Sequence, residues 1–264
     1  MQDLKITLIQ TSLAWGDKES NLHMLEDKIM SYKESTDIFV LPEMFNTGFI
    51  IQPEEVAEPW DGPSLQWMKL IASHKGCAVT GSIIVEDKGK YFNRLYWVTP
   101  DGLYRIYDKR HLFRMGNEHE RFSMGKSRVV IDYKGWKIMP LICYDLRFPV
   151  WSKNKFQFNK YEYDLLIYVA NWPSVRSDVW KSLLIARSIE NLAYVAGVNR
   201  VGIDGNGVEH TGDSGIYEPS GKPLFLLPPD EEIMATQLLS YEALQQWREK
   251  LNAGLDWDDF TIDY

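Results

Sequence analysis

The chain of 264 residues carries a formal net charge of −8, with 45% hydrophobic and 25% charged residues. This composition is that of an ordinary globular protein, and the negative charge argues against a nucleic-acid or anionic-membrane partner, which would require a basic face. The longest apolar runs, such as "LLIYVA" at 165–170, are far too short to span a bilayer.

The first half of the chain alternates strands with helices. Period-2 and continuous apolar patterns predict strands over residues 4–10, 37–43, 77–86, 94–100 and 103–109. Apolar residues at helical spacing predict one helix from Leu22 to Tyr32 and another from Ser64 to Lys75, which Gly76 would end.

The second half continues this pattern. Strands are predicted over 128–145 (a pair turning at Lys134 and Gly135), 164–171 and 193–199, followed by a glycine-rich hairpin over 202–215. Helices are predicted over 148–158, 177–191 and 240–252, with a last strand before the final helix. Neither a linker nor a repeat is visible, so we expect a single layered α/β domain over residues 1–264.

Cysteine usage indicates a reducing compartment. Cys77 and Cys143 are the only cysteines, and they form no CxxC motif. The N-terminal residues predict a strand and carry no basic-then-apolar leader. A cytoplasmic protein is therefore expected.

Three polar side chains follow predicted strands at similar positions. Glu43 ends "DIFVLPE", Lys109 ends "LYRIYDK" and Cys143 ends "KIMPLIC". Residues just past the carboxyl ends of strands commonly line the crevice of α/β folds. If the three strand ends converge, these groups suffice for acyl transfer without histidine, metal or cofactor.

The expected chemistry gives each group one role. Cys143 is the nucleophile, and Glu43 exchanges its proton with the leaving amine and later with water. Lys109 and the backbone N–H of Tyr144 stabilise the oxyanion. Taken singly, however, each residue has an ordinary alternative: a buried cysteine is often inert core, and Glu43 and Lys109 would usually be solvated.

Other groups of residues give weaker evidence for a functional site. The five histidines have no metal-ligand spacing, so a metal site is not expected. Cys77 lies within a predicted strand, which indicates a core position.

Three segments together resemble the signature motifs of the nitrilase superfamily of carbon–nitrogen hydrolases: "LPEMFNTGF", "YDKRHLF" and "LICYDLRFP". They occur in the order typical of that family. The resemblance implies a Glu43–Lys109–Cys143 triad, an α-β-β-α sandwich fold and a homodimer in which helix layers meet. It also implies a second glutamate beside the site, for which Glu118 is the candidate and Glu120 the alternative.

The longer stretches "KRHLFRMGNEH" and "CYDLRFPVW" are similar to the bacterial omega-amidase branch of that family. This similarity implies hydrolysis of the ω-amide of 2-oxo acid amides such as 2-oxoglutaramate. Many relatives have a glutamate after "RFP", where this chain has Val150. The difference leaves the expected triad intact.

A 2-oxo acid amide is an anion, so its pocket needs a cation, and arginine can bind a carboxylate through two hydrogen bonds. The candidates near the motifs are Arg110, Arg114, Arg147 and Arg176. For Arg147 we favour pairing with an acid inside the fold. Phe113, Arg114, Trp172 and Arg176 are the expected substrate contacts, although core packing is an equal alternative for the two aromatic residues.

Two other functions stay open at this stage. Another amidase or nitrilase would share the thioester chemistry and differ in its pocket walls. A non-catalytic binding protein on the same fold is a second possibility, because fold does not fix function. The complete triad argues against it.

Overall fold

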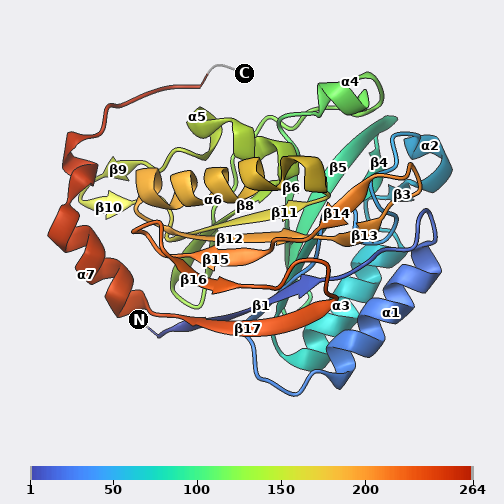
Figure 1. Ribbon diagram of the computed structural model, residues 1–264, viewed down its shortest axis with the longest axis horizontal. Helices are drawn as coiled ribbons and strands as arrows, with labels where there is room; N and C mark the ends of the chain where they lie inside the picture. Colours follow the sequence, from blue (N-terminus) through green and yellow to red (C-terminus); the bar gives the residue numbers. More distant parts are fainter. Residues whose placement is uncertain (1, 263–264) are drawn as a thin grey trace.

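A computed structural model describes residues 2–262, and it packs two β-sheets face to face with helices on both outer faces (Figure 1). This arrangement confirms the expected α-β-β-α sandwich. In Figure 1, α6 covers one sheet from above, while α1 and α3 cover the other sheet from below.

The first sheet contains the strands of the N-terminal part of the chain and the last strand. Across the sheet these are β17 (Ile233–Leu239), β1 (Leu4–Gln10), β2 (Ile38–Val40), β4 (Ala78–Asp87), β5 (Lys90–Val98) and β6 (Tyr104–Asp108), with β3 (Glu58–Pro59) beside β4. Strands β1, β2 and β4 run parallel to one another, and β17, β5 and β6 are antiparallel to their neighbours. Two helices lie against this sheet, α1 (Lys18–Ser31) and α3 (Pro63–Lys75).

The second sheet is built from the following part of the chain. Its strands are, in order, β16 (Pro223–Leu226), β15 (Gly215–Tyr217), β12 (Tyr194–Asn199), β11 (Leu165–Ala170), β8 (Trp136–Ile142) and β7 (Ile131–Tyr133). The central strands β8, β11 and β12 are parallel. Every residue of β11 and β12 is buried, as expected for parallel strands covered on both faces. Helix α6 (Ser177–Asn191) packs on the outer face.

The remaining elements are short, apart from one C-terminal helix. They are α2 (Pro53–Val56), α4 (Glu118–Arg121), α5 (Pro149–Ser152), α7 (Tyr241–Leu251), the hairpins β9 (Phe156–Gln157) with β10 (Lys160–Tyr161) and β13 (Val201–Ile203) with β14 (Glu209–Thr211), and the 3₁₀ turns η1 (Arg114–Gly116), η2 (Cys143–Arg147), η3 (Ser174–Arg176) and η4 (Ala253–Asp256).

Local chemistry explains why the longer helices begin and end where they do. Asp17 caps α1, and its carboxylate accepts the Ser20 N–H at 3.0 Å. Pro63 occupies the first turn of α3, and Gly76 ends that helix in the left-handed conformation, with φ of 65°. The predicted helix over 177–191 agrees with α6 at both ends.

Strand β1 contributes to two apolar layers of the core. Leu4, Ile6 and Leu8 project from β1 into the layer between the sheets. Ile9 and the α1 residue Leu25 belong to the layer between the first sheet and its helices. The alternation predicted for the first strand therefore places its two faces in two different cores.

One predicted helix is wrong. Of the residues from 148 to 158, only Pro149–Ser152 form a helix, and the chain then enters the β9–β10 hairpin. Phe158 and Asn159 both have positive φ, as a tight hairpin turn requires. The Asn154 side chain donates to the carbonyls of Tyr163 and Asn191, which holds the chain out of a helix.

Two positions near the cysteines and the first motif also differ from expectation. Cys77 lies just before β4 rather than within a strand, and it is fully buried. Strand β2 ends at Val40, so Glu43 follows it after Leu41 and Pro42.

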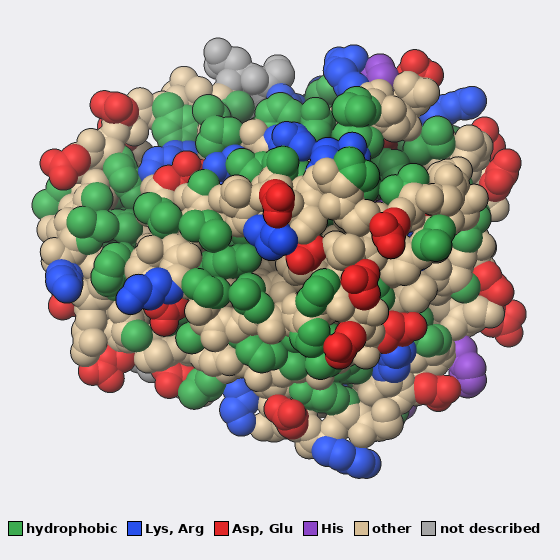
Figure 2. All heavy atoms as spheres, viewed as in Figure 1, with side chains coloured by type: hydrophobic (Ala, Val, Ile, Leu, Met, Phe, Trp, Pro, Cys, Tyr) green, Lys and Arg blue, Asp and Glu red, His purple; other side chains and the backbone are tan. Residues whose placement is uncertain are grey.

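Surface properties agree with the composition. No helix within residues 2–262 is long and apolar enough to cross a bilayer. On the face in Figure 2, basic side chains lie singly or in small groups among acidic and apolar ones.

We predict that Gly197→Ala destabilises the protein by about 1–3 kcal/mol through overpacking. A Cβ at Gly197 would lie 2.6 Å from Leu184 Cδ1 and 2.7 Å from Trp180 Cζ2, both in α6. Urea denaturation measures the loss. In a Leu184→Ala background the same change should cost less, because only the Trp180 contact then remains; an equal cost in both backgrounds would contradict the packing explanation.

Candidate active site

The three strand-end residues meet, although their strands lie in different sheets. Glu43 and Lys109 follow β2 and β6 of the first sheet, and Cys143 follows β8 of the second. Lys109 Nζ lies 2.8 Å from Glu43 Oε1, and both residues are close enough to Cys143 for their charges to act on the pKa of its thiol. Exposure is 0% for Glu43, 1% for Lys109 and 9% for Cys143. The site therefore lies where the two sheets meet.

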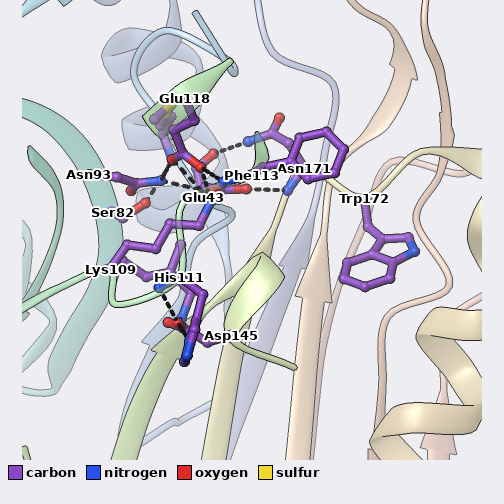
Figure 3. A network of polar contacts seen from close by, with 12 residues as sticks. Glu43, Ser82, Asn93, Lys109, His111, Phe113, Glu118, Asp145, Asn171 and Trp172 are labelled. Carbon is purple, nitrogen blue, oxygen red and sulfur yellow. Dashed lines mark hydrogen bonds and ion pairs between the residues drawn. The ribbon is translucent and has the colours of Figure 1, made fainter. Parts of the chain in front are cut away.

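A second glutamate completes the cluster. Lys109 Nζ donates to Glu118 Oε1 at 3.1 Å and Oε2 at 2.9 Å, and Glu118 is fully buried (Figure 3). The Phe113 N–H donates to the same carboxylate at 2.6 Å. Glu120 is exposed to solvent. The residue beside the lysine is thus Glu118 and not its alternative.

Two asparagines that the sequence did not single out hold Glu43. Asn93 Nδ2 donates to Glu43 Oε1 at 2.8 Å and to Glu118 Oε1 at 3.3 Å. The backbone N–H of Asn171 donates to Glu43 Oε2 at 2.8 Å, and its side-chain amide donates to the Glu43 carbonyl at 2.6 Å. Asn171 directly precedes Trp172 in "ANWP", at the end of β11. Its position directly after a buried strand could have identified it as a residue near the site.

Burial and neighbouring charges fix the resting protonation of the site. Burial alone would lower the pKa of Lys109, but the carboxylates of Glu118 and Glu43 outweigh it and raise the pKa. Burial, followed by the Glu43 charge, raises the pKa of the Cys143 thiol well above its ordinary value, although Lys109 acts in the opposite direction. Burial also raises the pKa of Glu118. The resting site therefore holds a charged lysine and a neutral thiol.

The turn that carries Cys143 is unusual in its backbone. Cys143 has φ of 43° at the start of the 3₁₀ turn η2, a conformation that non-glycine residues adopt rarely. Tyr144 follows in the first turn, where backbone N–H groups have no partner within the helix. Both residues line the same cavity.

Asp145 ties this turn to the segment that carries Lys109. Its carboxylate is fully buried and accepts the Ile142 N–H at 3.1 Å and the Tyr107 hydroxyl at 2.7 Å. The other oxygen accepts the His111 N–H at 2.9 Å and contacts His111 Nδ1 at 2.8 Å. Figure 3 shows this pair close to the glutamate–lysine cluster. Sequence reasoning missed Asp145, whose partners come from two sheets.

A cavity of about 380 Å³ opens onto Lys109 and Cys143. Its wall is mainly apolar and includes Phe49, Ile51, Phe113, Met115, Gly116, Tyr144, Arg147, Asn171, Trp172, Pro173, Val175, Arg176, Asp204, Asn206, Val208 and His210.

The expected substrate contacts divide into those at this wall and those away from it. Phe113, Trp172 and Arg176 line the cavity, whereas Arg114 is exposed outside it. The prediction for Arg114 is wrong because the short turn η1 directs Met115, and not Arg114, to the wall. Arg110 is also absent from the wall and contacts the Gly125 carbonyl instead.

The structure also contradicts the expectation that Arg147 pairs with an acid inside the fold. Arg147 lines the cavity and makes no ion pair with any residue in the described range 2–262. The nearby acid, Asp145, is already occupied by the four donors above. The predicted internal pairing of Arg147 is therefore wrong.

No group of three or more His, Cys, Asp or Glu side chains within residues 2–262 is arranged to hold a metal ion.

This fold and site define a carbon–nitrogen hydrolase. Residues 5–249 match the family model for carbon-nitrogen hydrolases, and the chain belongs to that family.

Individual relatives make the match more specific. The omega-amidase YafV of Escherichia coli (strain K12) is 43% identical over 262 residues, which cover 99% of this chain and 100% of the relative. The 2-oxoglutaramate amidase of Bacillus subtilis (strain 168) is 35% identical over 223 residues, with 83% and 84% covered. The crystal structure of XC1258 from Xanthomonas campestris, a CN-hydrolase superfamily protein with an arsenic adduct in its active site, has a TM-score of 0.97 at 42% identity, with both chains fully covered.

Removal of the Asp145 carboxylate should destabilise the fold. Asp145→Ala leaves buried backbone and side-chain donors without an acceptor, and we expect a loss of roughly 3 kcal/mol or more, measured by urea denaturation. Tyr107→Phe deletes one of these hydrogen bonds and also the hydroxyl that accepts from Trp151 Nε1 at 2.9 Å, so we expect a smaller loss of about 1–3 kcal/mol. If Asp145→Ala unfolds at the wild-type urea concentration, the linking role of Asp145 is wrong.

Proposed function

We propose that this protein is an omega-amidase that hydrolyses the ω-amide of 2-oxo dicarboxylate monoamides such as 2-oxoglutaramate, releasing the 2-oxo acid and ammonia. The observation that carries the proposal is the buried Glu43–Lys109–Cys143 cluster, which opens onto a cavity lined by arginines. The near full-length similarity to proteins named omega-amidase and 2-oxoglutaramate amidase supports the substrate class.

Acylation begins with the neutral thiol. Cys143 Sγ attacks the amide carbonyl carbon while its proton passes to the Glu43 carboxylate, and a C–S bond forms. The Lys109 ammonium and the Tyr144 N–H stabilise the oxyanion of the tetrahedral intermediate. Glu43 then gives its proton to the departing nitrogen. The C–N bond breaks, ammonia leaves and a thioester remains.

Deacylation repeats these roles with water. Glu43 takes a proton from a water molecule as its oxygen attacks the thioester carbon, and Lys109 again faces the oxyanion. Collapse of this intermediate breaks the C–S bond, and Glu43 returns the proton to sulfur. The 2-oxo acid leaves, and the resting state of the site is restored.

Glu118 positions Lys109 in this scheme. Both of its oxygens are engaged, one with Lys109 and Asn93 and the other with Lys109 and the Phe113 N–H. A carboxylate held in this way keeps the lysine charged and aimed at the site, and it leaves proton transfer to Glu43.

The cavity wall suits a small, partly apolar anion. Phe113 and Trp172 supply aromatic surface, and the Arg176 guanidinium lies 5.5 Å from the centre of the Phe113 ring. We propose that these three residues contact the substrate beyond its amide group. The alternative is another amidase or nitrilase of the same family, with the same chemistry and a different small amide or nitrile.

The setting of the enzyme is part of the proposal. The chemistry requires Cys143 as a free thiol, which the reducing cytoplasm maintains, and both cysteines are free in the structure. Val150 of α5 and Ile189 of α6 are 58% and 49% exposed. A second copy packed on this helix layer would cover them, so we propose a homodimer, which sedimentation velocity would detect.

The first test is ammonia release from 2-oxoglutaramate by the wild type and by Cys143→Ala. We expect turnover by the wild type and none by the variant, because no other group supplies the thioester. Cys77→Ala is the matched control and should keep full activity, since Cys77 is buried away from the cavity and burial raises its pKa to about 12. Selective alkylation of Cys143 without any turnover would favour the alternative substrates.

A second test separates the base from the nucleophile. Glu43→Gln should reduce kcat by roughly 10³-fold, because the proton acceptor is lost. The same variant removes the carboxylate charge that raises the thiol pKa while Lys109 remains, so the pKa of Cys143 should fall.

Alkylation by iodoacetamide measures that shift. Its rate should rise with pH in both proteins, since the thiolate reacts, and the Glu43→Gln curve should lie at lower pH. Both are measured in a Cys77→Ala background, with circular dichroism as the check on folding. A curve displaced to higher pH would contradict the assignment of Glu43.

A further inference from the structure

We propose that Arg147 is the specificity-determining residue that binds the substrate carboxylate at the end remote from the amide. This inference rests on the proposed function and identifies the group that recognises its substrate class. The sequence left four arginines as candidates, and the structure distinguishes among them.

The backbone of Arg147 is fixed relative to the nucleophile. Arg147 ends the 3₁₀ turn that Cys143 begins. The turn is held from one side by the Asp145 network and from the other by Arg187, whose Nη2 donates to the Leu146 carbonyl at 2.6 Å. Arg187 itself is only 3% exposed. The spacing between the reacting sulfur and the Arg147 backbone is therefore set by one rigid turn.

The Arg147 guanidinium lies on a fixed aromatic surface. It is 5.2 Å from the centre of the Trp172 ring. Trp172 is 4% exposed, its Nε1 donates to the Arg176 carbonyl at 2.8 Å, and its backbone N–H donates to Asn199 Oδ1 at 2.8 Å. A guanidinium stacked on such a ring keeps its N–H edge free for bidentate binding of a carboxylate.

Two arginines with buried side chains have acid partners, whereas the buried Arg200 donates to backbone carbonyls. Arg94 pairs with Asp108 at 2.7 Å, and Arg248 pairs with Asp164 at 2.6 Å. Arg147 has no such partner within residues 2–262, although it lines the cavity. An unpaired guanidinium facing the space next to the nucleophile is what an anionic substrate requires.

The charges around the cavity make a local cation necessary. Two carboxylates surround the single ammonium of Lys109, so this cluster would repel an anionic substrate. Asp204 also lines the cavity, and its carboxylate accepts the backbone N–H groups of Asn206 and Val208. It is thereby engaged in its own loop and does not pair with Arg147.

Arg176 occupies a different part of the wall. It follows Val175, which is 79% exposed, as is Met115 across the same cavity. Arg176 is itself half-buried, as Arg147 is, but it ends the separate turn η3, and its guanidinium lies 5.5 Å from the centre of the Phe113 ring and not in the turn that carries the nucleophile. We therefore assign the fixed carboxylate contact to Arg147.

Three amides that differ in one group test the assignment. 2-Oxoglutaramate has both the carboxylate and the oxo group, glutaramate has only the carboxylate, and 4-oxopentanamide has only the oxo group. For Arg147→Gln we expect kcat/KM to fall about 30- to 100-fold on both anions and less than about threefold on the neutral amide. Arg147→Lys should lower kcat/KM on the anions by an intermediate factor, because lysine keeps the charge but cannot form two parallel hydrogen bonds to a carboxylate.

Arg114→Gln is the matched control, since it removes the same charge from an exposed site outside the cavity. It should leave all three values within about twofold of wild type. An equal loss on the neutral amide in Arg147→Gln would show a merely structural role and overturn the proposal. Unchanged values on the anions would overturn it as well.

A binding measurement does not depend on turnover. 2-Oxoglutarate should protect Cys143 from iodoacetamide, and Arg147→Gln should raise the half-protecting concentration at least tenfold while the unprotected alkylation rate stays unchanged. Equal protection of both proteins would overturn the proposal. If the wild type hydrolyses none of the three amides, the proposed function is rejected instead, so the two failures are distinguishable.

Discussion

The active site depends on the burial of one lysine ammonium between two carboxylates. An unpaired ammonium at 1% exposure would cost many kcal/mol, and contacts of 2.8 and 2.9 Å to Glu43 and Glu118 offset that cost. Two carboxylates on one lysine leave excess negative charge. Hydrogen bonds from neutral donors stabilise this charge. Asn93 donates to both glutamates. Asn171 donates to Glu43, and the Phe113 N–H donates to Glu118. These partners are as necessary to the cluster as the ion pairs are.

Burial and, after it, the same excess charge act on the thiol. Both raise the pKa of Cys143, so the site does not rest as a thiolate paired with a cation. In the proposed mechanism this neutral thiol needs a base at the moment of attack, and Glu43, whose charge acts on the thiol pKa, has that role. Because Glu43 and Lys109 come from one sheet and Cys143 from the other, the packing of the sheets sets the catalytic geometry. Asp145 is one polar link across that junction, and Asn171, which donates to Glu43, is another.

The sequence predicted which residues converge better than it predicted the side chains that hold them in place, for a physical reason. Helical and strand periods arise from local burial, so α3 and α6 were predicted almost to the residue. The positions of Glu43, Lys109 and Cys143 past strand ends followed from the same patterns, and the family resemblance brought them together. Contacts between segments far apart along the chain have no such local signature, and this is why Asn93 and Asp145 were missed.

The arginine errors have the same origin. Arg147 stands near an acid in sequence, but that acid is saturated by donors from Tyr107 and His111, which lie far away along the chain. Arg114 lies beside motif residues, yet a single 3₁₀ turn decides which side chain meets the cavity. Neighbourhood in sequence predicts which segment approaches a site. Orientation within that segment depends on capping and on competition for partners.

Net charge and recognition act here on different length scales. A chain with a net charge of −8 is an unexpected host for an anionic substrate. Exposed charges farther away than about 8–10 Å are largely screened at physiological ionic strength, so most of the acidic surface contributes little inside the cavity. Groups at contact distance in a desolvated wall act almost unscreened. The local field is thus determined by Arg147, Arg176 and the glutamate–lysine cluster, and a few cations at the wall are enough to make an acidic protein select an anion.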